Sequence, residues 1–276
     1  MSALTSRIAF IGGGNMARSL IGGLARAGVP GAQITVAEPN AEPRSALAHD
    51  FGVTAYADAA DAARDADAIV LAVKPQVIKT VCVSLRDAVK ARKPMIVSIA
   101  AGIRIDQIAA WLGEDLAIVR TVPNTPALIG AGATALIANA HADAAQRQLA
   151  QSLFEAAGLT VWIDDEALMD TVTALSGSGP AYFFLLVEAL EDAAVAQGLP
   201  RDTARALAAQ TCLGAGRMLR EDGEAPAVLR RRVTSPNGTT QAAVESFEAN
   251  DLRAIIARAV AAATKRGQEL SAQMGD

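Results

Sequence analysis

The sequence predicts an α/β fold with a doubly wound parallel sheet in its first half, followed by an all-helical second half. Short apolar runs alternate with helical patterns up to residue 163. The first of these runs leads straight into a glycine-rich turn that opens a helix. Beyond residue 163 the periodicity is helical only. The chain has 276 residues, which is long enough for two domains, and we expect them to span 1–164 and 165–276.

The glycine-rich turn directly follows the first predicted strand, Ile8–Ile11, whose four apolar residues are typical of a buried parallel strand. The chain continues as Gly12-x-Gly14-x-x-Ala17 into a helical pattern. In such a turn the first glycine allows the tight bend, the second lets the backbone approach a pyrophosphate, and the small third residue lets helix and strand pack closely. The pattern predicts a Rossmann-type dinucleotide site, although a strand–helix turn without a ligand would use the same residues.

The second predicted strand, 34–37, ends at Glu38, where this kind of fold places the residue that contacts the ribose. A carboxylate there accepts a hydrogen bond from the 2′-hydroxyl of NAD and repels the 2′-phosphate of NADP. Arg44 follows closely and could receive a phosphate. Glu38 could also be an ordinary loop charge, so the choice between NADPH and NADH stays open.

Three further apolar runs, 68–73, 95–99 and 117–122, predict buried strands. The carboxyl ends of such strands are where open α/β sheets bind ligands. The residues found there are Lys74-Pro75, Ala100-Ala101-Gly102 and Pro123-Asn124-Thr125-Pro126. Small residues and a rigid turn could form a floor under a flat ring such as nicotinamide. Strands at 132–137 and 160–163, with helices over 77–90 and 142–157, complete an alternating βα pattern.

The second half begins with an acidic turn, Asp164-Asp165-Glu166. Ser178 is the expected N-cap of a helix over 181–197, with Pro180 in its first turn and Gly198 at its end. Further helices are predicted from Pro200 to about 220, from Pro226, and over 252–274.

A second candidate site lies between these helices at 233–240, Val-Thr-Ser-Pro-Asn-Gly-Thr-Thr. Pro, Asn and Gly favour a tight turn, and the hydroxyl side chains could simply cap the helix that follows. Successive N–H groups at Gly238, Thr239 and Thr240 would also form an anion site sized for a carboxylate.

Composition excludes several classes of function. The net charge is −4 without a long block of like charge, which makes nucleic acid an unexpected partner. Cys82 and Cys212 are too few for a disulfide framework and are expected to be reduced core thiols. We find no signal peptide, membrane-spanning run or metal-ligand spacing, so a cytoplasmic protein that needs no metal is expected.

The acids and bases favour one type of reaction. The histidines are His49 and His141, and the sole lysine after residue 93 is Lys265. Reduction of a ketone needs a proton donor at the developing alkoxide, and the helical half offers no obvious one. An imine can enter already protonated, so hydride transfer to a C=N bond needs only correct placement and a nearby hydroxyl. Tyr182, Glu166 or a water could still serve as a donor.

Taken together, these motifs resemble the pyrroline-5-carboxylate reductase family, and the resemblance covers essentially the whole chain. The stretches that carry it are Phe10–Ala17, Ala72–Pro75, Ser98–Gly102, Pro123–Pro126, Ser176–Tyr182 and Thr234–Thr240.

The resemblance implies reduction of 1-pyrroline-5-carboxylate to L-proline by NADPH or NADH, with a helical domain that forms a homodimer or a higher oligomer and sites between subunits. The residues expected at the cofactor are Ile11, Gly12, Gly13, Gly14, Asn15, Met16, Ala72, Val73, Lys74, Pro75 and Ala100, to which our own interpretation adds Glu38 and Asn124. The residues expected at the substrate are Ser235, Asn237, Gly238, Thr239, Thr240 and Glu166, with the Thr240 hydroxyl near the ring nitrogen.

The chain departs from the family pattern at three points. Asn237 replaces a common glycine, and asparagine tolerates the left-handed backbone that this turn needs. Glu38 stands where some relatives carry a phosphate-binding serine, and Arg232 stands where some carry an asparagine near the cofactor. The run Arg230-Arg231-Arg232 is typical of a solvated helix face, although Arg232 could compensate for Glu38. The competing hypotheses are a hydroxyacid or ketopantoate-type dehydrogenase and a dinucleotide-binding protein without catalysis.

Overall fold

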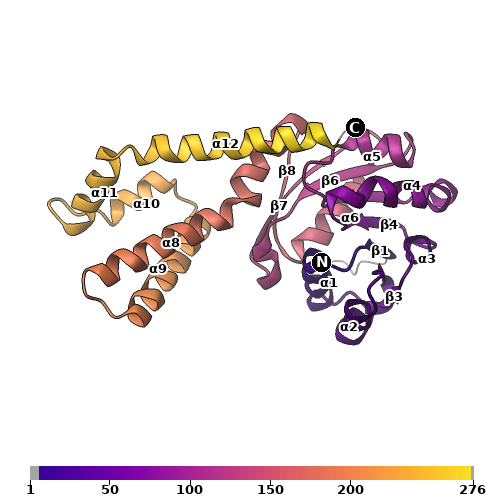
Figure 1. The fold of residues 1–276 in the computed structure, drawn as a ribbon, viewed down its shortest axis with the longest axis horizontal. Helices are drawn as coiled ribbons and strands as arrows, with labels where there is room; N and C mark the ends of the chain where they lie inside the picture. The colour runs from indigo at the N-terminus through magenta and orange to yellow at the C-terminus, as the bar shows by residue number, and fades with distance from the viewer. Residues whose placement is uncertain (1–5, 275–276) are drawn as a thin grey trace. The chain divides into compact units, whose positions relative to one another are not determined.

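The computed structural model describes residues 6–274 and divides the chain into two compact units (Figure 1). Unit 1 holds the residues up to Gly177 together with those from Ala263 onward, and unit 2 spans Ser178–Ala262. The last strand ends at Trp162. The helical segment 166–177 and the last part of the helix Leu252–Gln273 nevertheless belong to the sheet-containing unit by their contacts.

Unit 1 is built on an eight-stranded sheet with the order β3-β2-β1-β4-β5-β6-β7-β8. In that order the strands are Thr54–Tyr56, Ile34–Ala37, Ile8–Ile11, Ala68–Leu71, Met95–Ser98, Ile118–Val122, Gly132–Ala138 and Gly158–Trp162. β1 pairs in parallel with both β2 and β4, so the strand order reverses beside β1. That reversal creates the crevice in which a doubly wound sheet binds its ligand.

Helices cover both faces of this sheet, as the doubly wound prediction requires. α1 (Asn15–Arg26), α2 (Ala41–Phe51) and α6 (Ala144–Glu155) pack in one core with Ile8 and Phe10. α3 (Ala59–Ala63), α4 (Pro75–Arg92) and α5 (Ile105–Leu112) pack in the other with Ala9 and Ile11. Alternate residues of β1 therefore serve opposite faces, which explains why this strand is apolar throughout.

The predicted alternating βα pattern is wrong at one point. β7 runs antiparallel to β6, and β8 then runs parallel to β7. The chain between β6 and β7 forms a short 3₁₀ turn, Thr125–Ile129, where a parallel partner would need a long crossover. Sequence analysis also did not assign β3, α2, α3 or α5.

Unit 2 is helical, with α8 (Gly179–Ala196), α9 (Arg201–Glu221), α10 (Pro226–Arg232), α11 (Thr239–Ala249) and the first part of α12 (Leu252–Gln273). Pro180 and Pro226 stand in the first turns of their helices as predicted. Ser178 stands at the N-cap position of α8 as predicted, but it has helical angles and its side chain makes no capping bond. The chain before it, from Glu166, is already helical: a 3₁₀ turn (Glu166–Leu168), α7 (Met169–Val172) and a π-helical segment (Thr173–Gly177).

Candidate active site

The glycine-rich loop leaves β1 in a conformation that a side chain would not allow. Gly12 has φ +106°, and a Cβ atom there would lie 2.5 Å from the Ala72 carbonyl oxygen. Its N–H donates to the Ala37 carbonyl at 2.9 Å. The loop is therefore held between the ends of β2 and β4, and glycine is required for both the angle and the close approach.

Helix α1 begins immediately after this loop and presents an open N-terminus. Gly14 is its N-cap, and no side chain in the described part of the protein caps it. The N–H groups of Asn15 and Met16 start the helix and have no partner within it. A Cβ at Gly14 would meet nothing within 4 Å, so the surface over the loop is open. This arrangement fits a pyrophosphate group, which takes backbone N–H donors and the positive end of the helix dipole.

Glu38 lies beside the same loop and is 9% exposed. Its Oε2 atom accepts a hydrogen bond from the Gly13 N–H at 3.1 Å. Its Oε1 atom accepts from the backbone N–H and the side-chain amide of Asn40, at 3.0 Å and 2.9 Å. The ribose-contacting residue that the sequence predicted is thus tied to the glycine loop by its carboxylate.

The remaining predicted cofactor residues of unit 1 follow the ends of the central strands. Ala72 and Val73 continue from β4, Lys74 is the N-cap of α4, and Pro75 is its first residue. Ala100 follows β5 and is buried. Because β1, β4, β5 and β6 are parallel, these ends meet at one edge of the sheet.

Asn124 follows β6, but its side chain is occupied by the protein itself. Its amide donates to the Ser176 carbonyl at 3.0 Å, and its amide oxygen accepts from the Ala133 N–H at 2.8 Å. It therefore links the turn after β6 to β7 and to the π-helical segment. This is a structural role that sequence analysis did not anticipate.

The second candidate site is the loop before α11 in unit 2. Asn237 has φ +59°, which confirms the left-handed turn predicted for it. A Cβ at Gly238 would lie 2.5 Å from Ser235 Oγ, so the loop closes tightly on itself at this residue. Gly238 is also the N-cap of α11, and no side chain in residues 6–274 caps that helix.

One of the three N–H groups expected to form the anion site at α11 is already used. The Gly238 N–H donates to the Ser235 carbonyl at 3.1 Å, which closes the turn. The N–H groups of Thr239 and Thr240 begin the helix and have no partner within it. These two N–H groups and the side-chain hydroxyls are what remains of the predicted anion site.

Arg232, at the end of α10, is held by acids of its own unit. It donates to Glu224 at 2.7 Å and lies 3.5 Å from Asp222. The structure thus gives Arg232 carboxylate partners that sequence analysis did not foresee.

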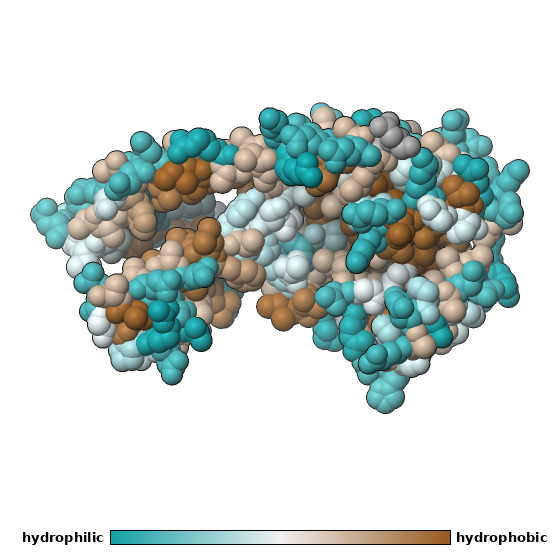
Figure 2. Space-filling view, viewed as in Figure 1, coloured by the Kyte–Doolittle hydropathy of each residue, from teal (hydrophilic) through white to brown (hydrophobic). Residues whose placement is uncertain are grey.

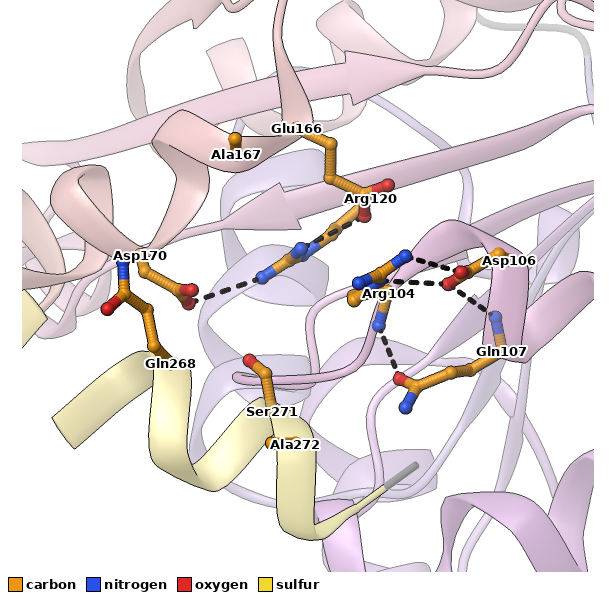
Figure 3. A pocket seen from close by; sticks show the side chains of 10 residues that line it. All are labelled: Arg104, Asp106, Gln107, Arg120, Glu166, Ala167, Asp170, Gln268, Ser271 and Ala272. Atoms are coloured by element: carbon orange, nitrogen blue, oxygen red, sulfur yellow. Dashed lines mark hydrogen bonds and ion pairs between the residues drawn. The ribbon is translucent and has the colours of Figure 1, made fainter. Parts of the chain in front are cut away.

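Glu166 lies at a cleft of about 590 Å³ in unit 1, which Figure 3 shows from close by. Its Oε1 atom accepts from Arg120 Nη1 and from the Ile105 N–H, both at 2.9 Å. The Arg120 side chain is 2% exposed and comes from the middle of β6. Its Nε and Nη2 atoms have no hydrogen-bond partner among the described residues, although Asp170 lies 3.9 Å from Nη2. Arg120 was not predicted as a site residue. The one feature of the sequence that could have indicated it is a single charged residue inside an apolar strand.

Both cysteines are free thiols. Burial raises the pKa of Cys82 to about 12, so this thiol is inert. Cys212 is half-buried, which departs from the core position predicted for it. In the described part of the chain no group of His, Cys, Asp and Glu could hold a metal ion, and no helix is long and apolar enough to cross a membrane.

The helices of unit 2 expose many large apolar side chains. Phe183, Phe184 and Leu185 of α8 are 59%, 68% and 64% exposed. Other exposed apolar residues of this unit include Leu186, Leu190, Leu207, Leu213, Met218, Leu219, Val233, Phe247, Ile255 and Ile256. Figure 2 shows hydrophobic surface over these helices. A helix that is apolar on most sides is normally buried, so this unit has the surface of an interface.

The doubly wound sheet and the open N-termini of α1 and α11 are typical of an oxidoreductase that binds a dinucleotide. The helical unit with its exposed apolar side chains adds an interface. Residues 166–270 match the family model "pyrroline-5-carboxylate reductase dimerisation", and residues 7–102 match "NADP oxidoreductase coenzyme F420-dependent". The chain is 53% identical to a pyrroline-5-carboxylate reductase of Pseudomonas aeruginosa, covering 98% of this chain and 99% of that one. It belongs to the pyrroline-5-carboxylate reductase family.

Solved structures agree with this assignment. A pyrroline-5-carboxylate reductase from Coxiella burnetii superposes with a TM-score of 0.94 at 43% identity, covering 97% of this chain and 99% of that one. The pyrroline carboxylate reductase of Plasmodium falciparum, solved with NADP bound, has a TM-score of 0.85 at 27% identity and covers 98% and 100%.

Proposed function

We propose that this protein reduces 1-pyrroline-5-carboxylate to L-proline, the last step of proline biosynthesis, with NADH or NADPH as the reductant. The observation that carries the proposal is the open N-terminus of α11, which offers a carboxylate site on a chain that also holds a complete dinucleotide loop. Relatives named pyrroline-5-carboxylate reductase align with nearly the whole chain and support the same substrate.

The dinucleotide site is formed by the loop from Ile11 to Met16, by Glu38, and by the strand ends at Ala72–Pro75 and Ala100. The bound cofactor supplies a hydride to the carbon of the C=N bond. The glycines admit the pyrophosphate, α1 neutralises part of its charge, and Glu38 fixes the ribose. Asn124 supports the turn that lies under this site, and Arg232 is proposed only as a more distant cofactor residue.

At the substrate, Thr239 and Thr240 hold the carboxylate through their N–H groups, and Ser235, Asn237 and Gly238 shape the loop. The Thr240 hydroxyl lies near the ring nitrogen. Because that nitrogen enters protonated and becomes a neutral amine, the protein needs to orient the ring more than to deliver a strong acid. Glu166 is proposed as a substrate-side carboxylate, since both of its hydrogen bonds fall on Oε1.

We also propose that the chain works as a homodimer or a higher homo-oligomer in the cytoplasm. The exposed apolar side chains of α8 and the match of 166–270 to a dimerisation family support the oligomer. The proposed use of a reduced nicotinamide cofactor supports the location in the cytoplasm. In functional terms we assign 1–164 to the dinucleotide and 165–276 to substrate binding and dimerisation.

The test is loss of absorbance at the reduced-nicotinamide band with 1-pyrroline-5-carboxylate, with proline measured as the product. A 2-ketoacid serves as the control substrate. Turnover of the imine with formation of proline supports the proposal. Turnover of the ketoacid alone, or none with folded oligomeric protein, would replace it with a hydroxyacid dehydrogenase or a non-catalytic protein.

A further inference from the structure

We infer that this protein prefers NADH to NADPH and that Glu38 determines the preference, with Asn40 as the residue that positions its carboxylate. The inference rests on the proposed function, because it concerns the adenosine end of the same cofactor. Glu38 stands at the end of β2, and the structure shows which groups hold its carboxylate.

The Glu38 carboxylate is fixed in place by three donors. Gly13 N–H binds Oε2 at 3.1 Å, and Asn40 binds Oε1 through its backbone N–H at 3.0 Å and its side-chain amide at 2.9 Å. An ionised carboxylate accepts about four hydrogen bonds. Oε2 therefore keeps the capacity to accept one more, which matches a single ribose hydroxyl.

The carboxylate cannot move aside easily for a 2′-phosphate. The residue is 9% exposed, and rotation of its side chain would break all three hydrogen bonds and leave the Gly13 N–H unpaired. A Cβ built at Gly13 would lie 3.2 Å from Glu38 Oε2 and 2.6 Å from Leu47 Cδ1, which shows how closely the loop packs here. A phosphate would meet a fixed negative charge.

Two nearby donors that could compensate, Arg44 Nη1 and Asn40, already donate within the protein. Arg44 Nη1 donates to the carbonyl oxygens of Glu38 and Pro39, at 2.9 Å and 2.8 Å. Both donor groups of Asn40 are directed to Glu38. A phosphate would have to take these donors from the protein, whereas a ribose hydroxyl needs none of them. The arrangement therefore selects the cofactor without the phosphate.

The experiment measures binding of NAD⁺ and NADP⁺ by isothermal titration calorimetry, with no substrate present. We expect NAD⁺ to bind at least about 10-fold more tightly than NADP⁺, because a fixed like charge opposes the phosphate. Glu38→Ser should improve NADP⁺ binding and weaken NAD⁺ binding, so that the ratio falls at least about 10-fold. Asn40→Ala should lower the ratio by a smaller factor, since the backbone N–H of residue 40 still holds Oε1.

Glu42→Gln is the matched control, because Glu42 is an exposed carboxylate in the first turn of the same helix, α2. It removes one charge nearby and should leave the ratio unchanged. Equal or tighter binding of NADP⁺ to the natural protein would overturn the inference. So would a fall in the affinity ratio for Glu42→Gln as large as that for Glu38→Ser, because the preference would then come from the overall negative charge of this region. Binding of neither dinucleotide would instead refute the proposed function. Thermal unfolding of each variant verifies that it is folded.

Discussion

The two helix N-termini that carry the candidate sites, α1 in unit 1 and α11 in unit 2, are built in different ways. The loop before α1 is held by residues far away in the sequence, since Gly12 donates to Ala37 and Gly13 donates to Glu38. The loop before α11 is held by its own neighbours. Gly238 donates to the Ser235 carbonyl, and the Asn237 N–H donates to the Gln241 side chain.

We therefore expect changes in the two loops to differ in their effect on the stability of the protein. The first loop is held at Gly12 and Gly13 against the ends of β2 and β4, so a change at those two residues disturbs the strand ends as well as the ligand. The second loop closes its own turn at the exposed start of a helix, so a change there should affect the ligand with little effect on folding. Each variant below tests one side of this contrast.

The largest effect is expected from Gly12→Ala. The new methyl group would lie 2.5 Å from the Ala72 carbonyl oxygen at a residue with φ +106°. Strain and overlap together should lower the free energy of unfolding by roughly 3 kcal/mol or more and abolish dinucleotide binding. Urea denaturation followed by circular dichroism measures the first effect.

Gly14→Ala is the control in the same loop, because a Cβ there meets nothing within 4 Å. Its stability should stay within about 0.5 kcal/mol of the natural protein, while dinucleotide binding weakens because the methyl group covers the open surface. Equal destabilisation by Gly12→Ala and Gly14→Ala would contradict the view that the close contacts of Gly12 with distant residues hold the first loop.

The second prediction concerns Glu166, which sequence analysis assigned to the substrate and which the structure pairs with buried Arg120. Glu166→Ala would remove the hydrogen-bonded carboxylate of that guanidinium and leave Asp170, 3.9 Å from Nη2, as its acidic partner, so the free energy of unfolding should fall by about 2 kcal/mol. Glu166→Gln keeps an oxygen that can accept from Arg120 and Ile105, so its loss should be near 1 kcal/mol. Calorimetric melting of both variants measures the difference. An unchanged melting temperature with a raised KM would show that Glu166 serves the substrate alone.

Sequence reasoning succeeded where the determinants are local. Both glycine-containing turns, the buried strands and the proline-led helices follow from residues adjacent in the chain. It failed where a partner is distant. The role of Arg120 depends on its hydrogen bond to Glu166, which lies 46 residues away in the sequence. The antiparallel direction of β7 depends on how the chain turns after β6. Even in the second loop, the use of the Gly238 N–H by Ser235 needed coordinates.

The third prediction tests the second loop. Thr240→Val removes the hydroxyl proposed to lie near the ring nitrogen and should lower kcat by about 10- to 100-fold. The free energy of unfolding should change by less than about 0.5 kcal/mol, because the helix N-terminus remains. Thr240→Ser should restore most of the activity. Steady-state kinetics and urea denaturation together separate the two effects, and a large loss of stability would mean that this loop resembles the first one.

The smallest effect is expected at Glu191, which joins α8 to α9 within unit 2. Its carboxylate accepts from Arg205 and Arg201, and these hydrogen bonds, that of Arg205 first, hold the pKa of Glu191 below its usual range. A carboxyl with a lowered pKa in the folded state stabilises the protein fully above its ordinary pKa of about 4.3. That contribution is lost as the pH falls through the lower folded-state value.

Glu191→Gln should therefore melt below the natural protein at pH 7, and the gap should narrow as the pH falls below about 4. Glu188→Gln, an exposed carboxyl on the same helix, is the control and should show little gap at either pH. The effect is small because the side chains of Arg201 and Arg205 are largely in water, at 47% and 67% exposure. A gap that widened in acid would mean that Glu191 stabilises unit 2 in its protonated form, and the ion cluster would then not be what joins these helices.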